Sequence, residues 1–366
     1  MRRLLVLLST LTAGVLFALP AVPGSAGTGG HAAITITQNS DFLSCGCVTG
    51  GDGSPGNPFI IGPWTINAPS GGTSGYSVKV DNTIVNGKAS ITDYFNIVGI
   101  ASTYTDTTTT DPTIWLDGVN TATTISGASG NGLSVGIELD NSSNISIDNV
   151  SYNKGNGTGV YINNSSNVSI NNSKFKATCN ICTPHTGDGI YAVNSSNLNI
   201  GTGADCPNKI PCIDVTYDDG WGIYLQNTSG VTINQVAADA DDTGGYVFDG
   251  GSNIILENSS SQGGGSICHT YLGQKLPTGY NTDMQGGLHL VNGTQKDKIV
   301  NDTFANNTTV DIASGGNGFI DNPCAGGKQP SPNSPETKMG DGNTFTNICY
   351  NSSINITGLP PSTCKS

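Results

Sequence analysis

Residues 159–172 read GVYINNSSNVSINN. Val160 and Ile162 alternate with polar or aromatic residues, and after an Asn/Ser turn the alternation resumes at Val168 and Ile170. Alternation of β-branched residues with period two is typical of a short strand that is buried on one face. The stretch therefore predicts two short strands joined by a tight polar turn.

The phrase at this turn returns along the chain, and each copy follows a glycine by five residues. The copies are NSSNISI from Asn141, NSSNVSI from Asn164, NSSNLNI from Asn194, NTSGVTI from Asn227, GGSNIIL from Gly250 and a fainter NGTQKDK from Asn292. The preceding glycines are Gly136, Gly159, Gly189, Gly222, Gly245 and Gly287. They are 23, 30, 33, 23 and 42 residues apart, which gives a base period of 23 with three insertions. A fixed period of this size predicts a solenoid, in which each repeat buries its apolar face by stacking on its neighbours.

Short strands, many glycines and no helical periodicity predict that this solenoid is all-β, a right-handed parallel β-helix with coils of about 23 residues and disulfide-stapled loop insertions. Over residues 131–258 the pattern resembles the right-handed parallel β-helix repeat superfamily, which includes pectate-lyase-like enzymes, NosD-like proteins and many archaeal surface proteins. Upstream, GDGSPGNPFIIGPWTI at 51–66 is similar to the segment that leads into the first coils of such proteins.

The chain divides into four regions. Arg2 and Arg3 precede an apolar run, and Gly24-Ser25-Ala26 offers a small-x-small cleavage site, so 1–26 is predicted to be a secretory signal peptide. We predict an N-terminal cap region at 27–50, the β-helix at 51–322, and a Pro-rich linker, last coil and cap at 323–366. The protein is expected to be secreted, extracellular or at the cell surface, without a transmembrane segment after signal removal.

Charge restricts the partners. Removal of the signal leaves 12 lysines and no arginine against 27 acidic residues, a net charge of −15. Such a chain has no electrostatic footprint for nucleic acid, so no nucleic-acid partner is expected. Carbohydrate, other envelope proteins or a second copy of the chain remain as partners.

Ten cysteines in an exported chain favour disulfides over metal or redox chemistry. Local pairing favours four bridges and leaves Cys45 and Cys47 for a fifth, although the sequence alone does not settle the connectivity. They are Cys179–Cys182, Cys206–Cys212, Cys268–Cys324, Cys349–Cys364 and, across a single glycine where strain is expected, Cys45–Cys47.

The asparagines support two predictions. Asn144, Asn167, Asn197 and Asn253 are expected to align at an inward-facing turn, where their amides form a hydrogen-bonded ladder. In addition, N-x-S/T sequons occur at 17 asparagines. They predict glycosylation at exposed sites, or reflect only a turn chemistry rich in Asn, Ser and Thr. The glycosylation candidates are Asn141, Asn156, Asn171, Asn227, Asn306 and Asn355.

The insertions at 171–188, 201–221 and 257–286 all fall after a turn and its strand, so they are predicted to project from one edge of the solenoid. Acidic residues stand just before the glycines at the same edge, with two aromatic residues beside the central pair. The predicted ligand-binding residues are Asp188, Tyr217, Asp218, Asp219, Trp221, Asp241, Asp242 and Asp283.

Three interpretations of this acidic edge compete. Asp218, Asp219, Asp241 and Asp242 could hold Ca²⁺ through hard oxygen ligands, and no other cofactor is expected. Asp219 and Asp242 could act as acid and base on a glycosidic bond. The third interpretation is a solvated acidic turn.

The catalytic signatures of known β-helix enzymes mostly fail. The resemblance implies an arginine for pectate-lyase-like catalysis, and the mature chain has none. Asn281-Thr282-Asp283 matches one polygalacturonase-like motif, but its companion motifs are absent. We therefore predict a structural or interaction protein that contacts carbohydrate or itself. The alternatives are a polysaccharide hydrolase or lyase, and a filament subunit that donates 32–38 (AAITITQ) to a neighbour's open edge.

Overall fold

The computed structural model describes 18 segments of the chain. They are residues 30–67, 75–82, 84–85, 88–103, 111–131, 135–155, 157–177, 187–202, 211–215, 220–238, 244–262, 286–291, 294–305, 312–314, 344–346, 348–350, 353–354 and 361–363.

Almost all described strands belong to three sheets of eleven strands each. Sheet A consists of β1 (Gly30–His31), β5 (Trp64–Asn67), β10 (Ile100–Thr103), β13 (Ser129–Asn131), β16 (Ser151–Gly155), β19 (Ser173–Ala177), β22 (Ile213–Asp214), β25 (Val236–Ala237), β28 (Ser260–Gln262), β31 (Thr303–Ala305) and β34 (Cys349–Tyr350). Sheet B consists of β2 (Ile34–Ile36), β6 (Val78–Asp81), β11 (Pro112–Asp117), β14 (Val135–Asp140), β17 (Val160–Asn163), β20 (Ile190–Val193), β23 (Trp221–Gln226), β26 (Gly244–Asp249), β29 (Gly286–Val291), β32 (Ile312–Ser314) and β35 (Ser353–Ile354). Sheet C consists of β3 (Val48–Gly50), β4 (Phe59–Ile61), β9 (Phe95–Val98), β12 (Thr123–Ser126), β15 (Ser143–Asp148), β18 (Ser166–Asn171), β21 (Ser196–Ile200), β24 (Ser229–Asn234), β27 (Ser252–Glu257), β30 (Lys298–Val300) and β33 (Thr344–Thr346).

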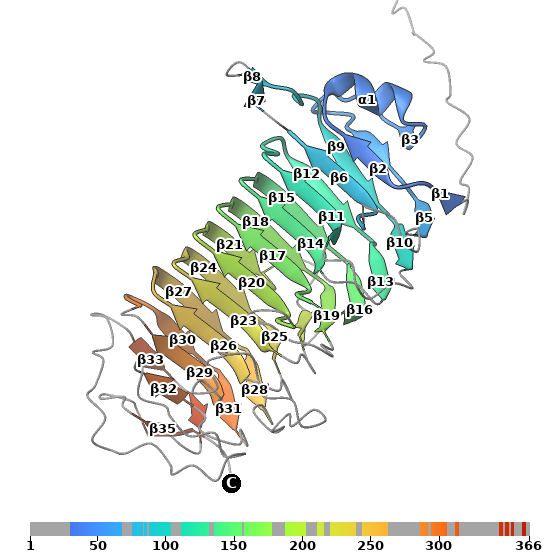
Figure 1. The fold of residues 1–366 in the computed structure, drawn as a ribbon. Coiled ribbons are helices and arrows are strands. Elements are labelled where there is room, and N and C mark those ends of the chain that lie inside the picture. The colour runs from blue at the N-terminus through green and yellow to red at the C-terminus, as the bar shows by residue number, and fades with distance from the viewer. Residues whose placement is uncertain are drawn as a thin grey trace, which may run out of the picture.

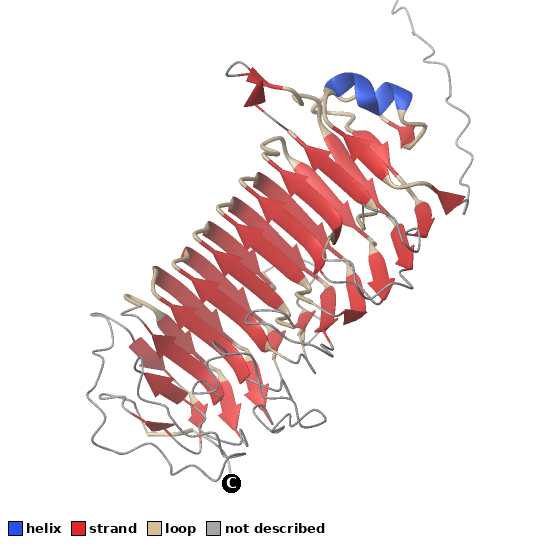
Figure 2. Cartoon of the chain, in the orientation of Figure 1, coloured by secondary structure: helices blue, strands red, loops and turns tan. Residues whose placement is uncertain are grey.

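In each coil a strand of sheet B is followed by one of sheet C and one of sheet A, and the next strand of sheet B begins the next coil. The strands β14, β15, β16 and β17 show this order (Figure 1). Apart from β3 with β4, all pairings within the three sheets are parallel, and Figure 2 shows the strands stacked like the rungs of one long column. The predicted fold class is confirmed: the chain folds as a right-handed parallel β-helix. A pair outside these sheets, β7 (Ile84–Val85) with β8 (Lys88–Ala89), is antiparallel.

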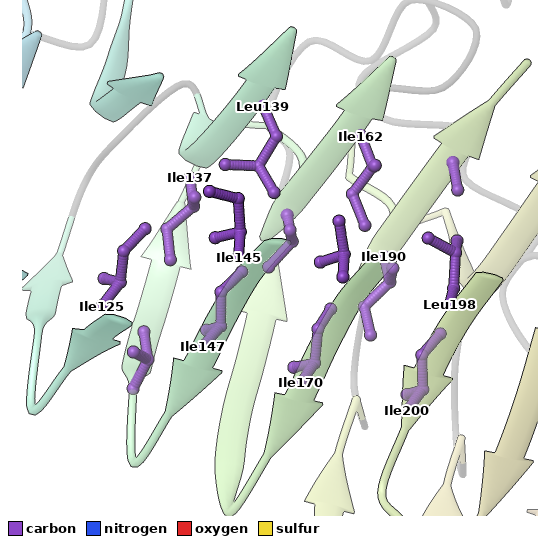
Figure 3. Close-up of a cluster of buried hydrophobic side chains, with 14 of the residues drawn as sticks. Ile125, Ile137, Leu139, Ile145, Ile147, Ile162, Ile170, Ile190, Leu198 and Ile200 are labelled. Atoms are coloured by element: carbon purple, nitrogen blue, oxygen red, sulfur yellow. The ribbon is translucent and has the colours of Figure 1, made fainter. Parts of the chain in front are cut away.

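The interior is filled by the apolar positions of the alternation. Val168 and Ile170 in β18 lie opposite Ile145 and Ile147 in β15, and all four side chains are buried. Figure 3 shows such side chains stacked in rows between the sheets. Because a residue's nearest neighbours in its row come from the coils above and below, the core forms only when coils stack, as the period predicted.

The backbone conformation at the corners between sheets B and C explains why asparagine recurs there. Asn141, Asn144, Asn164 and Asn167 all have φ between 48° and 63°, in the left-handed region. Asparagine is one of the few residues with a side chain that adopts this conformation readily. The Asn-rich phrase is therefore a backbone requirement of the tight corner between sheets B and C.

The predicted asparagine ladder exists, but its predicted direction is wrong. The Nδ2 of Asn167 donates to Oδ1 of Asn144 at 3.3 Å, and the Nδ2 of Asn197 donates to Oδ1 of Asn167 at 3.3 Å. These side chains, and that of Asn253, are exposed rather than buried. The left-handed backbone conformation at the corner turns these side chains outward, so the ladder lies on the surface of the column.

The inward ladder consists of hydroxyl groups. Ser142, Ser165, Ser195 and Thr228 occupy the same corner in successive coils, and all are buried. The N–H of Ser142 donates to Oγ of Ser165 at 3.0 Å, and the N–H of Ser165 donates to Oγ of Ser195 at 3.1 Å. Each hydroxyl thus satisfies a backbone N–H that the corner removes from the regular strand pairing.

Ser165→Ala is expected to lower the free energy of unfolding by about 1–3 kcal/mol, because the buried N–H of Ser142 loses its acceptor. The neighbouring Ser166→Ala, at a half-buried outward position, serves as the matched control and should change stability by less than about 0.5 kcal/mol. Urea unfolding of both variants provides the measurement. Equal losses at the two serines would show that the hydroxyl ladder does not stabilise the corner.

The N-terminal end of the column is closed by α1 (Asn39–Ser44). Phe42 of this helix is buried against Phe59 and Phe95, with ring centroids 5.1 and 5.4 Å apart. The adjacent strand β2 pairs in parallel with β6 of its own chain. In the single chain β2 completes the chain's own sheet B, and donation of 32–38 to a neighbour stays a prediction.

The connections from sheet A to sheet B carry much of the chain's variation in length. The predicted insertions at 171–188 and 257–286 contain β19 and β28, and most of their remaining residues fall at this edge, between β19 and β20 and between β28 and β29. The third, at 201–221, is divided: 203–210 follow a strand of sheet C, and only 216–219 precede a strand of sheet B. Two of the predicted insertions therefore fall at one edge of the column and most of the third does not, while their projection from that edge stays a prediction, because these loops lie outside the described residues.

Two of the predicted disulfides reach the described residues. Cys45 and Cys47 are bonded. Cys212 is also in a disulfide, whose predicted partner Cys206 lies outside the described residues. The Cys179–Cys182 and Cys268–Cys324 pairs lie outside as well, and the Cys349–Cys364 pair stays a prediction because only the backbone of Cys349 is described. Among the described residues, no helix is long and apolar enough to cross a membrane.

Candidate functional site

The predicted acidic edge is represented in the structure by two of its eight residues, Asp188 and Trp221. Tyr217, Asp218, Asp219, Asp241, Asp242 and Asp283 lie outside the described residues, so the calcium and catalytic hypotheses built on them stay predictions. Asp188 is 1% exposed, and its Oδ1 accepts the N–H of Trp221 at 2.7 Å. The carboxylate therefore ties the start of β23 to the coil before it.

A second feature of the same sheet was missed by sequence reasoning: a row of large side chains on the outer face of sheet B, here called the outer row. Its members occupy one register position in successive strands from β6 to β29. They are Lys79, Trp115, Glu138, Tyr161, Tyr191, Tyr224, Val247 and His289. The signal was available, because from Glu138 onward each member stands two residues after a period-marking glycine.

The aromatic members of the outer row contact one another along the column. The ring centroids of Tyr161 and Tyr191 are 5.3 Å apart, and those of Tyr191 and Tyr224 are 5.4 Å apart with the rings perpendicular. At the other end, Nζ of Lys79 lies 3.9 Å from the ring centroid of Trp115. Parallel strand stacking imposes this spacing, so tyrosine repeated at one position builds an aromatic strip from Tyr161 to Tyr224, and Glu138 separates this strip from Trp115.

A second row runs beside the first, two residues further along each strand, and it is polar at every position except Val193. Its members from β6 to β26 are Asp81, Asp117, Asp140, Asn163, Val193, Gln226 and Asp249. Hydrogen bonds join the two rows: Nε1 of Trp115 donates to Oδ2 of Asp140 at 2.9 Å, and the hydroxyl of Tyr224 donates to Oδ2 of Asp249 at 2.8 Å. The strip is therefore flanked by fixed acceptors.

The outer row has an open half and a buried half. Trp115, Glu138, Tyr161 and Tyr191 are half-buried, as expected for side chains on an uncovered sheet face. Tyr224, Val247 and His289 are at most 3% exposed. Trp221 packs with Tyr224 and Val247 in a hydrophobic cluster separate from the main core. A ligand from solution can thus reach the strip over β11 to β20.

Among the titratable groups of the open half, Glu138 has the pKa that is shifted most. Burial raises its pKa to about 8, and the neighbouring charges of Asp140, Asp111 and Asp117 add to the effect. Glu138 is therefore a protonated carboxylic acid at neutral pH, and it shares a hydrogen bond with Asp140. In the buried half, burial lowers the pKa of His289 to about 4, so its imidazole is neutral.

The arrangement offers two kinds of chemistry. Half-buried aromatic rings beside fixed polar groups are suited to bind the faces and hydroxyls of a sugar chain. A protonated carboxylic acid next to a carboxylate is suited to donate a proton. Within the described part of the chain, no group of three or more His, Cys, Asp and Glu side chains is arranged to hold a metal ion.

Three of the glycosylation candidates lie in the described coils. Asn141 and Asn227 are exposed at left-handed corners, and Asn171 is half-buried at the end of β18. Asn156, Asn306 and Asn355 lie outside the described residues. Glycosylation of all six stays a prediction.

No family model matches the sequence, and no curated protein matches it. The fold places the chain among the right-handed parallel β-helix proteins. Solved structures that it is similar to include the enzymatically active domain of tailspike protein 2 from bacteriophage CBA120, with 11% identity and a TM-score of 0.45. That match covers 79% of this chain and 39% of the tailspike chain, so this chain spans well under half of it.

Two further solved structures are similar over a larger share of their own length. An alginate lyase from Paenibacillus sp. str. FPU-7 is 11% identical, with 88% of this chain and 99% of that chain covered and a TM-score of 0.43. A periplasmic alginate epimerase is 8% identical, with 88% and 85% covered and a TM-score of 0.46. At these identities and scores the matches carry no argument, and the function has to be argued from the residues of this chain.

Proposed function

We propose that this protein is an exported carbohydrate-binding β-helix, which holds a polysaccharide chain along the open half of its outer row. The observation that carries the proposal is the strip formed by Trp115, Tyr161 and Tyr191 at one register position of sheet B. The three rings lie on an accessible face, where the hydrophobic effect alone disfavours exposed aromatic side chains.

The dimensions of the strip suit an extended glycan. From Trp115 to Tyr191 it crosses three rung spacings, or about 14 Å, along the column axis. A chain laid along this axis can place successive sugar rings against successive side chains. The polar row alongside supplies carboxylate and amide groups, which hydrogen-bond to sugar hydroxyls and fix the orientation of the chain.

Export is part of the same proposal. The charged N-terminus, the apolar run and the small-x-small site at 24–26 support it. An exported protein of this charge meets polysaccharides of an envelope or a matrix, where a long, rigid column offers many sugar units a binding surface.

A second candidate function is a polysaccharide hydrolase or lyase, and Glu138 is the observation that favours it. This carboxylic acid lies between Trp115 and Tyr161 in the outer row, where a bound sugar would meet it. Its raised pKa allows it to act as a general acid at neutral pH. Products with new reducing or unsaturated ends, formed by the wild type and lost in Glu138→Gln, would support this activity.

Binding of oligosaccharides to the full chain tests the main proposal. Tyr161→Ala and Tyr191→Ala are each expected to weaken binding about tenfold or more, because loss of an aromatic anchor costs roughly 1.4–2 kcal/mol. Ser169→Ala, on the outer face of sheet C in the coil that holds Tyr161, is the control and should bind as the wild type does. Isothermal titration calorimetry after a glycan-array survey gives the affinities.

The result that would overturn the proposal is equally specific. A wild-type protein that binds no glycan, or alanine variants that keep wild-type affinity while their melting curves show an intact fold, would remove the outer row as a carbohydrate site.

A further inference from the structure

Over β6 to β20, carboxyl groups outnumber cations in the two outward-facing rows of sheet B. From β6 to β20 they contain four carboxyl groups, those of Asp81, Asp117, Glu138 and Asp140. The one cation in these described strands is Lys79, which lies 3.3 Å from Oδ2 of Asp81 and over the ring of Trp115. The open half is therefore an aromatic strip with an anionic border.

The border follows the strip closely. Asp117 pairs in register with Asp81 on one side and with Asp140 on the other, so the three carboxyls stand about one strand spacing apart. Like charges at this distance repel one another. The effect is visible in Glu138, where the charges of Asp140, Asp111 and Asp117 add to burial in raising the pKa. A cation that binds here would relieve the repulsion.

The carboxylates have acceptor capacity for such a ligand. Asp117 accepts a hydrogen bond from Nδ2 of Asn141 at 3.1 Å. Asp140 accepts hydrogen bonds from Nδ2 of Asn163 at 2.9 Å and Nε1 of Trp115 at 2.9 Å, and it shares a third with Glu138. A carboxylate can accept about four hydrogen bonds. These donors hold the carboxylates in place beside the rings, so the geometry is fixed before a ligand arrives.

We infer that the polysaccharide held by this face carries protonated amines, as a polymer of glucosamine with free amino groups does. The inference rests on the proposed carbohydrate-binding function and specifies its substrate class. Sugar rings lie against Trp115, Tyr161 and Tyr191, while ammonium groups donate to Asp117 and Asp140. A uronate polymer would place its carboxylates against this border, and a neutral polymer would leave the mutual repulsion of the border uncompensated.

The test compares two oligomers that share a backbone and differ only in the amine. Short glucosamine oligomers and N-acetylglucosamine oligomers of the same length are titrated into the full chain at mildly acidic pH, where the free amines are protonated. We expect the amine form to bind about tenfold tighter or more at low salt, and its advantage to shrink as salt screens the charges. Asp117→Asn should reduce that advantage, because it lowers the affinity for the amine form several-fold more than the affinity for the acetylated oligomer.

Asp148→Asn is the matched control. Asp148 belongs to β15, which directly follows the strand that carries Asp140, but it faces outward from sheet C. This variant loses the same charge from the coil next to that of Asp117, so it separates local contact from the overall charge of the protein. It should keep the full preference for the amine form.

The outcomes separate the inference from the function beneath it. If neither oligomer binds and no other glycan does, the proposed function itself fails. If the acetylated oligomer or a uronate oligomer binds as tightly as the amine form, and Tyr161→Ala weakens it, the carbohydrate site stands and the inferred substrate class is wrong. Equal loss of preference in Asp117→Asn and Asp148→Asn would also overturn the inference, because the preference would then reflect net charge alone.

Discussion

Gly159→Ala is expected to lower the free energy of unfolding by about 3 kcal/mol, the upper end of the cost of overpacking a closed core. A Cβ at this position would lie 2.6 Å from the carbonyl oxygen of Gly189 and 2.6 Å from Cβ of Phe175. The carbonyl accepts the N–H of Val160 at 3.0 Å, and Phe175 is fully buried. Neither neighbour can move without breaking a rung or opening the core.

Gly56→Ala provides the control, because no atom lies within 4 Å of a Cβ built there. It should change stability by less than about 0.5 kcal/mol. Urea unfolding of both variants gives the comparison. Equal losses in the free energy of unfolding for the two variants would show that glycine is not required at Gly159 by the packing of Phe175 of sheet A beneath sheet B.

The same glycine shows why the fold could be predicted from the sequence. The period of 23, the alternating apolar residues and the glycine before each turn are all local features that every coil repeats. Stacking turns each local feature into a row, so one correct coil predicts the column. The structure adds the reason for the glycine, which is the room that Gly136 and Gly159 leave for the aromatic rings of Tyr152 and Phe175.

The direction of the corner side chains could not be predicted in the same way. Ser165 and Asn167 are both polar, both stand in the repeated phrase and both have side chains that hydrogen-bond along the column. Alternation does not decide between them, because the left-handed residues at Asn164 and Asn167 interrupt the strand. Only the backbone conformation shows that the serine points inward and the asparagine outward.

The candidate site was missed for a related reason. In a single coil, Tyr161 is an ordinary aromatic residue in a strand, and its type is explained by β-propensity. Its significance appears only when register aligns it with Trp115, Glu138 and Tyr191. The sequence favoured the acidic residues instead because they stand just before the period-marking glycines of successive coils, although most of them lie in the connections between sheets A and B.

Asp302 leads to the second prediction, which concerns pH. In two other coils, Ser173 and Ser259 accept a backbone N–H at the corner between sheets C and A. In the coil after that of Ser259, Asp302 occupies the same corner position, and its Oδ1 accepts the N–H of Ser259 at 2.7 Å. The side chain is 1% exposed, so a carboxyl stands where the ladder elsewhere has a hydroxyl.

Burial raises the pKa of Asp302 to about 8, and the charge of Glu257 adds to the rise, while the N–H groups of Ser259 and Val300 oppose it. The folded state therefore holds a proton that the unfolded state, with an ordinary pKa of 3.8, releases. Stability from this group is complete below pH 3.8 and is lost as pH rises toward about 8. Each pKa unit corresponds to about 1.4 kcal/mol, so the loss amounts to several kcal/mol.

Asp302→Ser restores the hydroxyl of the other coils and removes the titration. We expect the variant to be more stable than the wild type above about pH 8 and to have a shallower downward slope between about pH 4 and pH 8. The slope that remains comes from Glu138 and Asp297, whose pKa values burial also raises. Melting curves across this range measure the slope, and hydrogen exchange at the amide of Ser259 locates it, because that amide donates to Asp302. Ser259→Asp, which places the same carboxyl one coil earlier, should add a second loss of the same sign. A wild type that melts at the same temperature at both ends of the range, or a serine variant whose slope is as steep as that of the wild type, would mean that Asp302 stays ionised in the folded coil and that its two N–H donors outweigh burial.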